Sequence, residues 1–240
     1  MKSIFSAILI FMVCSTVALA VTVEWFGQSS FEIIGKDGFR VVTDPYKPGA
    51  FDNAINYKPI TVSADVVTIS HEHLDHNYAE AIGGNPTILR NPGKQSIKEI
   101  EFKGISSYHD KVFGTQRGKN TIFTFTIDGI TFCHLGDLGT TLSKSQIQAI
   151  GKVNILFIPV GGAFTIDWQD AYKVIEQLNP NIVIPMHYKT DAVKLPLADV
   201  KEFLSKGGKQ PVDETTISKL EITKDKLPKP TKIVVMQYLQ

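Results

Sequence analysis

Cysteine is almost absent from this chain of 240 residues, which contains only Cys14 and Cys133. Cys14 lies in an apolar leader that we expect to be removed, so the mature chain would keep one cysteine and no intrachain disulfide. The alternating pattern of "GITFCHLGD" predicts that Cys133 is a small buried strand residue. A chain of this length can bury a stable core without covalent cross-links.

An excess of charge of one sign is also lacking. The chain has 25 Lys and Arg against 24 Asp and Glu, and loss of residues 1–20 removes only Lys2, which leaves 24 of each. No basic surface for nucleic acid is expected, because binding to phosphates depends on an excess of positive charge. With 43% hydrophobic and 20% charged residues, the composition is that of a globular protein.

Two common functional motifs are missing. No GxSxG pattern occurs, and "VGGAFT" at 160–165 has no nucleophile at its centre, which argues against a serine hydrolase of that type. The segment "NPGKQS" at 91–96 lacks the first glycine and the spacing of a phosphate-binding P-loop. Any hydrolysis must therefore use another source of nucleophile.

Long apolar runs are confined to the N-terminus. "MKSIFSAILIFMVCSTVALA" has one early lysine, an apolar centre and small residues at its end, which predicts a secretory signal peptide over residues 1–20, cleaved after Ala20. The alternative is an uncleaved membrane anchor, since Ile4–Val21 is just long enough to cross a bilayer. The protein is thus expected to be secreted or periplasmic, without a stable membrane span in its mature form.

The remaining chain, residues 21–240, is expected to form a single α/β domain. Strands are predicted at 21–35, 38–45, 65–69, 86–90, 100–108, 121–127, 129–135, 154–160, 181–186 and 231–239. Helices are predicted at 142–150, at 168–178 with Asp167 as its N-cap, and at 197–207. "KDG" at 36–38 predicts a hairpin between the first two runs. No repeat or linker interrupts this order.

Histidines gather where strands are predicted to end. The six are His71, His73, His76, His109, His134 and His187, and three of them fall in "HEHLDH" at 71–76. If the preceding strand continues, His71 and His73 point the same way and Glu72 points the opposite way, toward solvent or a structural partner. Functional side chains collect at such strand ends in α/β proteins.

This set of ligands exceeds what one structural ion needs. A structural zinc site has four ligands and usually includes cysteine. Imidazole and carboxylate groups suit zinc best, with manganese or iron as alternatives. The composition of the cluster therefore favours a catalytic metal site.

At this point the sequence resembles the metallo-β-lactamase fold hydrolases. "HEHLDH" matches their HxHxDH signature, and "SSYHD", "CHLGD" and "IPMHY" follow in the family's order. The branch it resembles most is the L-ascorbate-6-phosphate lactonase-like group, through "WFGQSSFEI", "TDP", "RGKNTIFTF", "HLGDLG" and "IPVGGAFTID". N-acyl-phosphatidylethanolamine phospholipase D is similar at a greater distance.

The resemblance implies a four-layer αββα sandwich, with two mixed sheets flanked by helices, and a pair of divalent ions. The implied ligands are His71, His73 and His109 for one ion, Asp75, His76 and His187 for the other, and Asp137 between the two. His134 matches no ligand position and is either a strand residue or a residue that contacts a ligand. Asp44 in "TDP" would either orient a ligand histidine through its second ring nitrogen or cap a turn.

Two residues depart from the family pattern. Gln28 and Ala163 stand where the branch often has histidine. Both lie outside the implied ligand set, so the departures concern substrate contacts more than metal binding. Six residues beside the motifs are candidates to line a substrate pocket: Tyr108, Arg117, Lys119, Phe164, Tyr188 and Lys189.

The expected activity is hydrolysis of a small ester or lactone. Two divalent ions about 3.5 to 4 Å apart share a water and lower its pKa to near neutrality, and Asp75 would orient that water or accept its proton. A phosphodiesterase or phospholipase of the same fold is the alternative enzyme, and a non-catalytic metal-dependent binding protein is the alternative from another class. The expected partner is a small-molecule substrate, nucleic acid is not expected, and the oligomeric state is left open.

Overall fold

A computed structural model describes residues 20–208, 210–214 and 217–239 of the chain. The predicted signal peptide lies outside the described residues except for Ala20, so its cleavage and the localisation stay predictions. Within the described part of the chain, no helix has the length and apolar character needed to cross a membrane.

The first of two sheets has six strands and is mixed. Its spatial order is β13-β1-β2-β3-β4-β5, with β4 parallel to both of its neighbours and the other pairs antiparallel. The strands are β1 (Val21–Gly27), β2 (Ser30–Ile34), β3 (Arg40–Thr43), β4 (Val66–Thr68), β5 (Thr87–Leu89) and β13 (Lys219–Ile222).

The second sheet has eight strands, in the order β12-β14-β11-β10-β9-β8-β7-β6. From β12 to β9 the strands are parallel, and from β9 to β6 they are antiparallel. They are β6 (Gly93–Ile97), β7 (Ile100–Tyr108), β8 (Lys119–Ile127), β9 (Ile130–His134), β10 (Ile155–Pro159), β11 (Ile182–Met186), β12 (Val212–Glu214) and β14 (Lys232–Val235).

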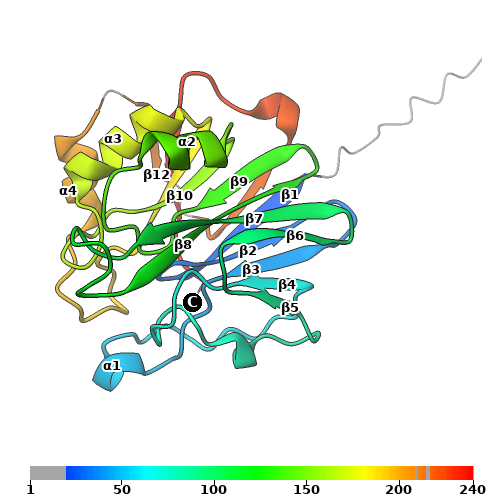
Figure 1. Cartoon of the computed structure of the whole chain (residues 1–240), viewed down its shortest axis with the longest axis horizontal. Helices are drawn as coiled ribbons and strands as arrows, with labels where there is room; N and C mark the ends of the chain where they lie inside the picture. Colours follow the sequence, from blue (N-terminus) through cyan, green and yellow to red (C-terminus); the bar gives the residue numbers. More distant parts are fainter. Residues whose placement is uncertain (1–19, 209, 215–216, 240) are drawn as a thin grey trace, which may run out of the picture.

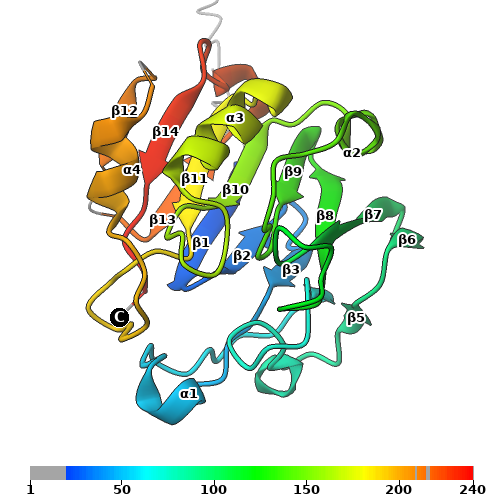
Figure 2. The ribbon, with the colours of Figure 1, turned by 60° about the vertical axis from the view of Figure 1, so that its left-hand side comes forward.

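The main hydrophobic core lies between the two sheets. Phe31 of β2 and Phe157 of β10 are fully buried, and their ring centroids are 4.3 Å apart. On the outer face of the eight-stranded sheet lie α2 (Lys144–Ile150), α3 (Trp168–Leu178) and α4 (Val200–Lys206), as Figures 1 and 2 show. Asp167 caps α3 as predicted, because its side chain accepts a hydrogen bond from the Asp170 N–H.

The outer face of the six-stranded sheet is covered mainly by an irregular segment, residues 46–64. Along β3 the side chains alternate, so that Val41 joins the core between the sheets while Val42 packs outward with residues such as Ile55. The segment includes the short turn α1 (Ala50–Asn53), which Figure 1 places at the open edge of the sheets. The predicted layered sandwich of two mixed sheets is therefore confirmed, with one outer layer that is mostly loop.

Several local predictions need correction. The predicted strand at 21–35 is two strands, because Gly27 and Gln28 adopt positive φ angles of 116° and 50° and turn β1 back into β2. The "KDG" hairpin joins β2 to β3 as predicted. Strands β6, β12 and β13 were not predicted. They lie near sheet edges and are largely polar and exposed, so they lack the apolar alternation that signals a strand.

The ends of four strands meet at one edge of the sandwich. β4, β7, β9 and β11 end at Thr68, Tyr108, His134 and Met186. The segments that follow them carry the histidines and aspartates of the candidate site.

Candidate metal centre

The "HEHLDH" motif forms a loop and does not continue β4, which ends at Thr68. The prediction that His71 and His73 share a strand face is therefore wrong. The loop nevertheless brings their rings together, with His71 Nε2 and His73 Nδ1 3.0 Å apart. Glu72 points away from the cluster, where its exposed carboxylate pairs with Arg90.

Three groups of three side chains could each hold an ion. The first is His71, His73 and His109, the second is Asp75, His76 and His187, and the third is Asp44, His71 and His76, which shares its histidines with the other two. In each group one nitrogen or oxygen atom per residue lies within 4.8 Å of the others. The first two are the groups that the family resemblance implies.

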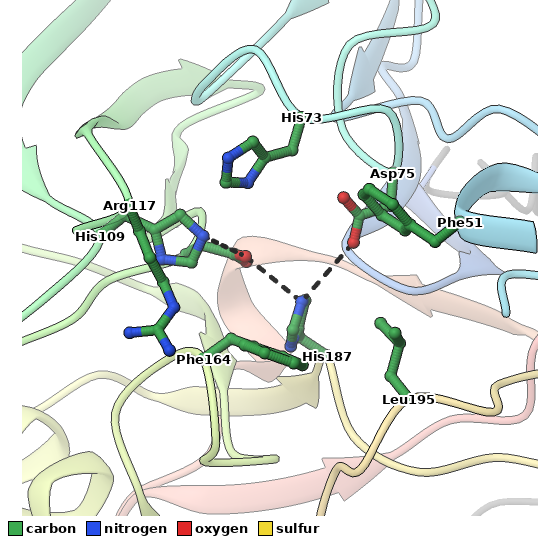
Figure 3. A pocket seen from close by; sticks show the side chains of 9 residues that line it. Phe51, His73, Asp75, His109, Arg117, Phe164, His187 and Leu195 are labelled. Carbon is green, nitrogen blue, oxygen red and sulfur yellow. Dashed lines mark ion pairs between the residues drawn. The ribbon is translucent and has the colours of Figure 1, made fainter.

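Asp137 lies between the two groups. Its Oδ2 is 3.2 Å from His109 Nε2, 3.3 Å from His76 Nε2 and 3.3 Å from His187 Nε2. Figure 3 shows the pairing of His187 and Asp75, whose Nε2 and Oδ2 atoms are 3.8 Å apart. One carboxylate oxygen of Asp137 thus faces residues of both groups.

Asp44 orients two of these histidines from behind. The Ser70 hydroxyl donates to Asp44 Oδ2 at 2.5 Å, and His76 Nδ1 lies 2.9 Å from the same oxygen. Since the hydroxyl hydrogen of Ser70 is committed to Asp44, His71 Nδ1, at 2.9 Å, must donate to Ser70 Oγ. Both rings therefore carry hydrogen on Nδ1, and their Nε2 atoms face the cluster. Asp44 Oδ1 also accepts from the Ser70 N–H at 2.7 Å, so the carboxylate contacts both a histidine ring and the backbone of the loop.

Asp137 lies in the loop after β9, and Asn120 of β8 fixes the backbone of this loop. Asn120 Oδ1 accepts from the Asp137 N–H at 2.9 Å, and Asn120 Nδ2 donates to Leu135 O at 2.8 Å. Gly139 lies so close to the loop after β7 that an added Cβ would be 2.3 Å from the Asp110 nitrogen. The segments that carry His109 and Asp137 therefore pack against each other backbone to backbone.

Burial and charge shift the pKa values in the cluster in opposite directions. Burial, together with the charge of His76, lowers the pKa of His71 from 6.5 to about 3. Burial also opposes charge on His76, but the carboxylates of Asp137, Asp75 and Asp44 outweigh it and hold that pKa well above 6.5. Burial would raise the pKa of Asp137, yet the histidines around it hold that pKa well below its ordinary value. Without cations, one site proton therefore resides on His76 at neutral pH.

The residues fit divalent cations. His76 Nε2 and Asp137 Oδ1 are buried and have no hydrogen-bond partner among the described residues. Two buried carboxylates and five imidazoles converge on one small volume, an arrangement that is costly unless positive charge compensates it. The nitrogen and oxygen donors match zinc, with manganese or iron as alternatives.

A cavity of about 350 Å³ opens on this cluster. Its lining residues are Phe51, His73, Asp75, His109, Arg117, Asp137, Phe164, His187 and Leu195. Figure 3 shows Arg117 beside His109 and Phe164, across the cavity from Phe51 and Leu195. A cavity of this size accepts a small organic molecule.

Of the six residues predicted to line a pocket, Arg117 and Phe164 do so. Lys119 lines a neighbouring groove, and Tyr188 is buried in the core beside Trp25. The Lys189 ammonium donates to Leu195 O, and Tyr108 packs against Phe113. These four residues are absent from the cavity lining.

The two departures from the family pattern have different consequences. Gln28 donates from Nε2 to Asp75 Oδ2 at 2.8 Å, so this position still contacts the cluster. Ala163 is exposed with φ 54° and offers no polar group, and the neighbouring Phe164 supplies the wall of the cavity.

His134 is a buried strand residue outside the two ligand groups. Its Nε2 donates to Ser29 O at 2.8 Å, and its Nδ1 accepts from the Gly136 N–H at 3.2 Å. With both ring nitrogens engaged and no exposed surface, His134 is not available to protonate a leaving group. Cys133 is a fully buried free cysteine, as predicted, and burial raises the pKa of its thiol.

Comparison with known proteins agrees with this geometry. The profile of the "Beta-lactamase superfamily domain" matches residues 22–187, which include all seven candidate ligands. The chain belongs to the β-lactamase superfamily. Its sheets, helices and histidine motifs are those of the metallo-β-lactamase fold.

Relatives within the superfamily are similar over most of their length. A UPF0173 metal-dependent hydrolase of Carboxydothermus hydrogenoformans is 28% identical over 77% of this chain and 91% of its own. A second, from Thermoplasma acidophilum, is 30% identical over 77% of this chain and 89% of its own. A Thermotoga maritima structure, described as a candidate Zn-dependent hydrolase of the metallo-β-lactamase superfamily, shares 35% identity at a TM-score of 0.74, covering 91% of this chain and all of that one.

Some site residues carry no sequence signal. Ser70 and Asn120 act through contacts with residues 1 and 17 positions away. Gln28 was noted only as a departure from the family pattern, and its contact with Asp75, 47 positions away, was not predicted. Phe51 and Leu195 come from loops without motifs. Only "TDP" and the residues flanking "HEHLDH" offered a hint, through their position at strand ends.

Proposed function

We propose that this protein binds two divalent cations, most simply zinc, and uses them to hydrolyse a small ester or lactone. The general class, a metal-dependent hydrolase of the metallo-β-lactamase fold, is the one that its relatives' names give. The paired ions and the substrate class are the proposal. The observation that carries it is the position of Asp137, whose Oδ2 lies within 3.3 Å of His109 in one group and of His76 and His187 in the other.

The cations and Asp75 would have different roles in the reaction. Bound cations would lower the pKa of a shared water and stabilise the negative charge that develops on the substrate oxygen. Asp75 is buried, accepts from Gln28 and contacts His76, and the charges of His76 and His187 outweigh burial and hold its pKa below its ordinary value. A carboxylate that is so weakly basic orients a water through a hydrogen bond better than it removes the proton.

The cavity walls select the substrate's size and polarity. Phe51, Phe164 and Leu195 give apolar surface, and the 350 Å³ volume limits the molecule to a small one. No serine or cysteine nucleophile is needed, in agreement with the missing GxSxG motif.

Substitution of Asp75 by alanine tests the mechanism. We expect Asp75→Ala to fold, to retain part of its metal and to lose at least 100-fold in kcat, because the water is no longer oriented. Glu72→Ala is the matched control, since Glu72 belongs to the same motif but its carboxylate points to solvent. Turnover of chromogenic esters, lactones and phosphodiesters is measured with zinc, manganese or iron restored to chelator-treated protein.

The same panel separates the alternatives. Hydrolysis of esters or lactones that Asp75→Ala abolishes would support the proposal. Preference for phosphodiesters would favour the phosphodiesterase alternative. Metal binding without turnover of any substrate would favour a binding protein, and full activity in Asp75→Ala would refute the role of this carboxylate.

A further inference from the structure

The chain's three arginines differ in their partners. Arg40 pairs with Glu32 at 2.7 Å, and Arg90 pairs with Glu72 at 2.8 Å. Among the described residues, no carboxylate forms an ion pair with Arg117. Its guanidinium lies instead over the ring of Phe164, 5.5 Å from the centroid. Arg117 therefore keeps its hydrogen-bond donors free of any carboxylate in the part of the chain that the structure describes.

Arg117 is also the one cationic side chain that lines the cavity over the metal cluster, among the described residues. It is half-buried, and it shares the cavity wall with His109 and Phe164 (Figure 3). The opposite wall, formed by Phe51 and Leu195, is apolar. A molecule in this cavity therefore meets a positive charge on one side and a hydrocarbon surface on the other.

The backbone of Arg117 is fixed by a carboxylate outside the cavity. Asp110 accepts hydrogen bonds from the N–H groups of Val112, Gly114, Gln116 and Arg117, the last at 2.8 Å. Burial would raise the pKa of Asp110, but these four donors lower it to about 2. The loop is thus held at neutral pH through its backbone, so a change of the Arg117 side chain leaves these bonds intact. The guanidinium is presented from a preorganised loop, which reduces the entropy lost on binding.

We propose that Arg117 is a specificity-determining residue that binds an anionic group, carboxylate or phosphate, on the substrate. The planar guanidinium binds either group through paired N–H donors, while Phe164 supports it from below and Phe51 and Leu195 contact the apolar part. The substrate is then a small ester or lactone that carries a negative charge away from the scissile bond. The hydrolysis of such a substrate rests on the proposed function, but the binding of the anion by Arg117 can be tested without any hydrolysis.

The kinetic test compares esters that differ in charge. Hydrolysis of 4-nitrophenyl acetate, mono-4-nitrophenyl succinate and a 4-nitrophenyl ester of phosphonoacetate is measured for wild type, Arg117→Met and Arg117→Lys. The quantity compared is kcat/KM for the better anionic ester divided by kcat/KM for the neutral ester. We expect Arg117→Met to lower this ratio at least tenfold, mainly through a higher KM for the anionic ester. Arg117→Lys should restore part of the ratio, and Arg90→Met, an arginine outside the cavity, should match wild type. A preference for the succinate ester indicates a carboxylate as the bound anion, and a preference for the phosphonoacetate ester indicates a phosphate.

A binding measurement separates this inference from the proposed function. Calorimetry on chelator-treated protein compares phenylphosphonate with neutral benzyl alcohol. We expect phenylphosphonate to bind wild type at least tenfold more tightly than Arg117→Met, with thermal unfolding confirming that the variant is folded. If wild type hydrolyses no ester but this difference appears, the anion site stands and the proposed reaction fails. If esters are hydrolysed but neither the kinetic ratio nor phenylphosphonate binding depends on Arg117, the inference is overturned and Arg117 merely packs on Phe164.

Discussion

At the scale of single residues, the candidate centre depends on Asp44, which lies outside the two proposed ligand groups. Asp44 sets the orientation of two histidines, directly for His76 and through Ser70 for His71. It is fully buried and adopts φ 37°, an uncommon angle for a residue other than glycine. The sequence left two roles open for Asp44, orienting a histidine or capping a turn, because "TDP" can equally form a simple turn.

Asp44→Asn should weaken metal binding without unfolding the protein. An amide keeps the shape but replaces one acceptor oxygen by a donor. The Ser70 N–H on Oδ1, and the Ser70 hydroxyl and His76 on Oδ2, can then no longer all donate to it. We expect zinc affinity to fall about 10- to 100-fold, the usual cost of losing such an orienting partner. Competition with a chromogenic chelator measures the change. Asp65→Asn, at a carboxylate that contacts Lys98 near the surface, should bind zinc like wild type, and equal affinity in Asp44→Asn would refute the orienting role.

The histidines predict how the metal-free protein responds to pH. The pKa of His71 falls to about 3 in the folded protein, so between pH 3 and 6.5 the unfolded chain binds more protons and acid lowers the free energy of unfolding. The pKa of His76 lies well above 6.5, so above pH 6.5 the folded protein holds the extra proton and stability falls as pH rises. Stability should therefore be greatest near pH 6.5.

Urea unfolding of chelator-treated protein from about pH 5 to pH 8 measures this profile. His71→Asn should reduce the slope on the acid side, to which His73 and His134 also contribute because burial lowers their pKa values, and His76→Asn should flatten the alkaline side. A stability that rises steadily across the whole range would contradict the assignment of the proton to His76.

At the scale of elements, the strands position the site and close backbone contacts lock it. β7 and β9 deliver His109 and the Asp137 loop to the same edge, and Gly139 lets the two following loops touch. Strand existence was predictable because β7 to β9 show apolar alternation, while β10 and β11 are short continuous apolar runs that are buried throughout. The loop conformation of "HEHLDH" was not, because its turn depends on contacts with Asp44 and Asn77 side chains and on the facing loops, which no local pattern encodes.

Gly139→Ala should separate these two loops. The added methyl would lie 2.3 Å from the Asp110 nitrogen, and we expect a loss of about 1 to 3 kcal/mol in stability with at least tenfold weaker zinc binding. Gly38→Ala is the control, since its Cβ meets nothing within 4 Å and only its φ of 83° is unfavourable. The control should lose stability by a similar amount, about 1 to 2 kcal/mol, yet bind zinc normally. Unchanged zinc affinity in Gly139→Ala would show that this contact does not position the ligands.

At the scale of the whole molecule, two sheets and a limited number of motifs determine the architecture. The fold class and the grouping of the candidate ligands could be anticipated, because four motifs resemble those of the metallo-β-lactamase fold hydrolases. The polar edge strands, the loop layer over the six-stranded sheet and the walls of the cavity could not, since they depend on contacts between distant segments such as Phe51 and Leu195.

The central claim is that residues from four strand ends form one centre for two ions. Its most direct test is the metal content of purified, zinc-saturated protein, measured by native mass spectrometry and elemental analysis together with ester hydrolysis. We predict two zinc ions per chain in wild type and about one in His73→Ala and in His187→Ala, each of which removes a ligand from a different group, with hydrolysis lost in both. A fully active wild type with a single ion, or two ions retained in both variants, would contradict the account.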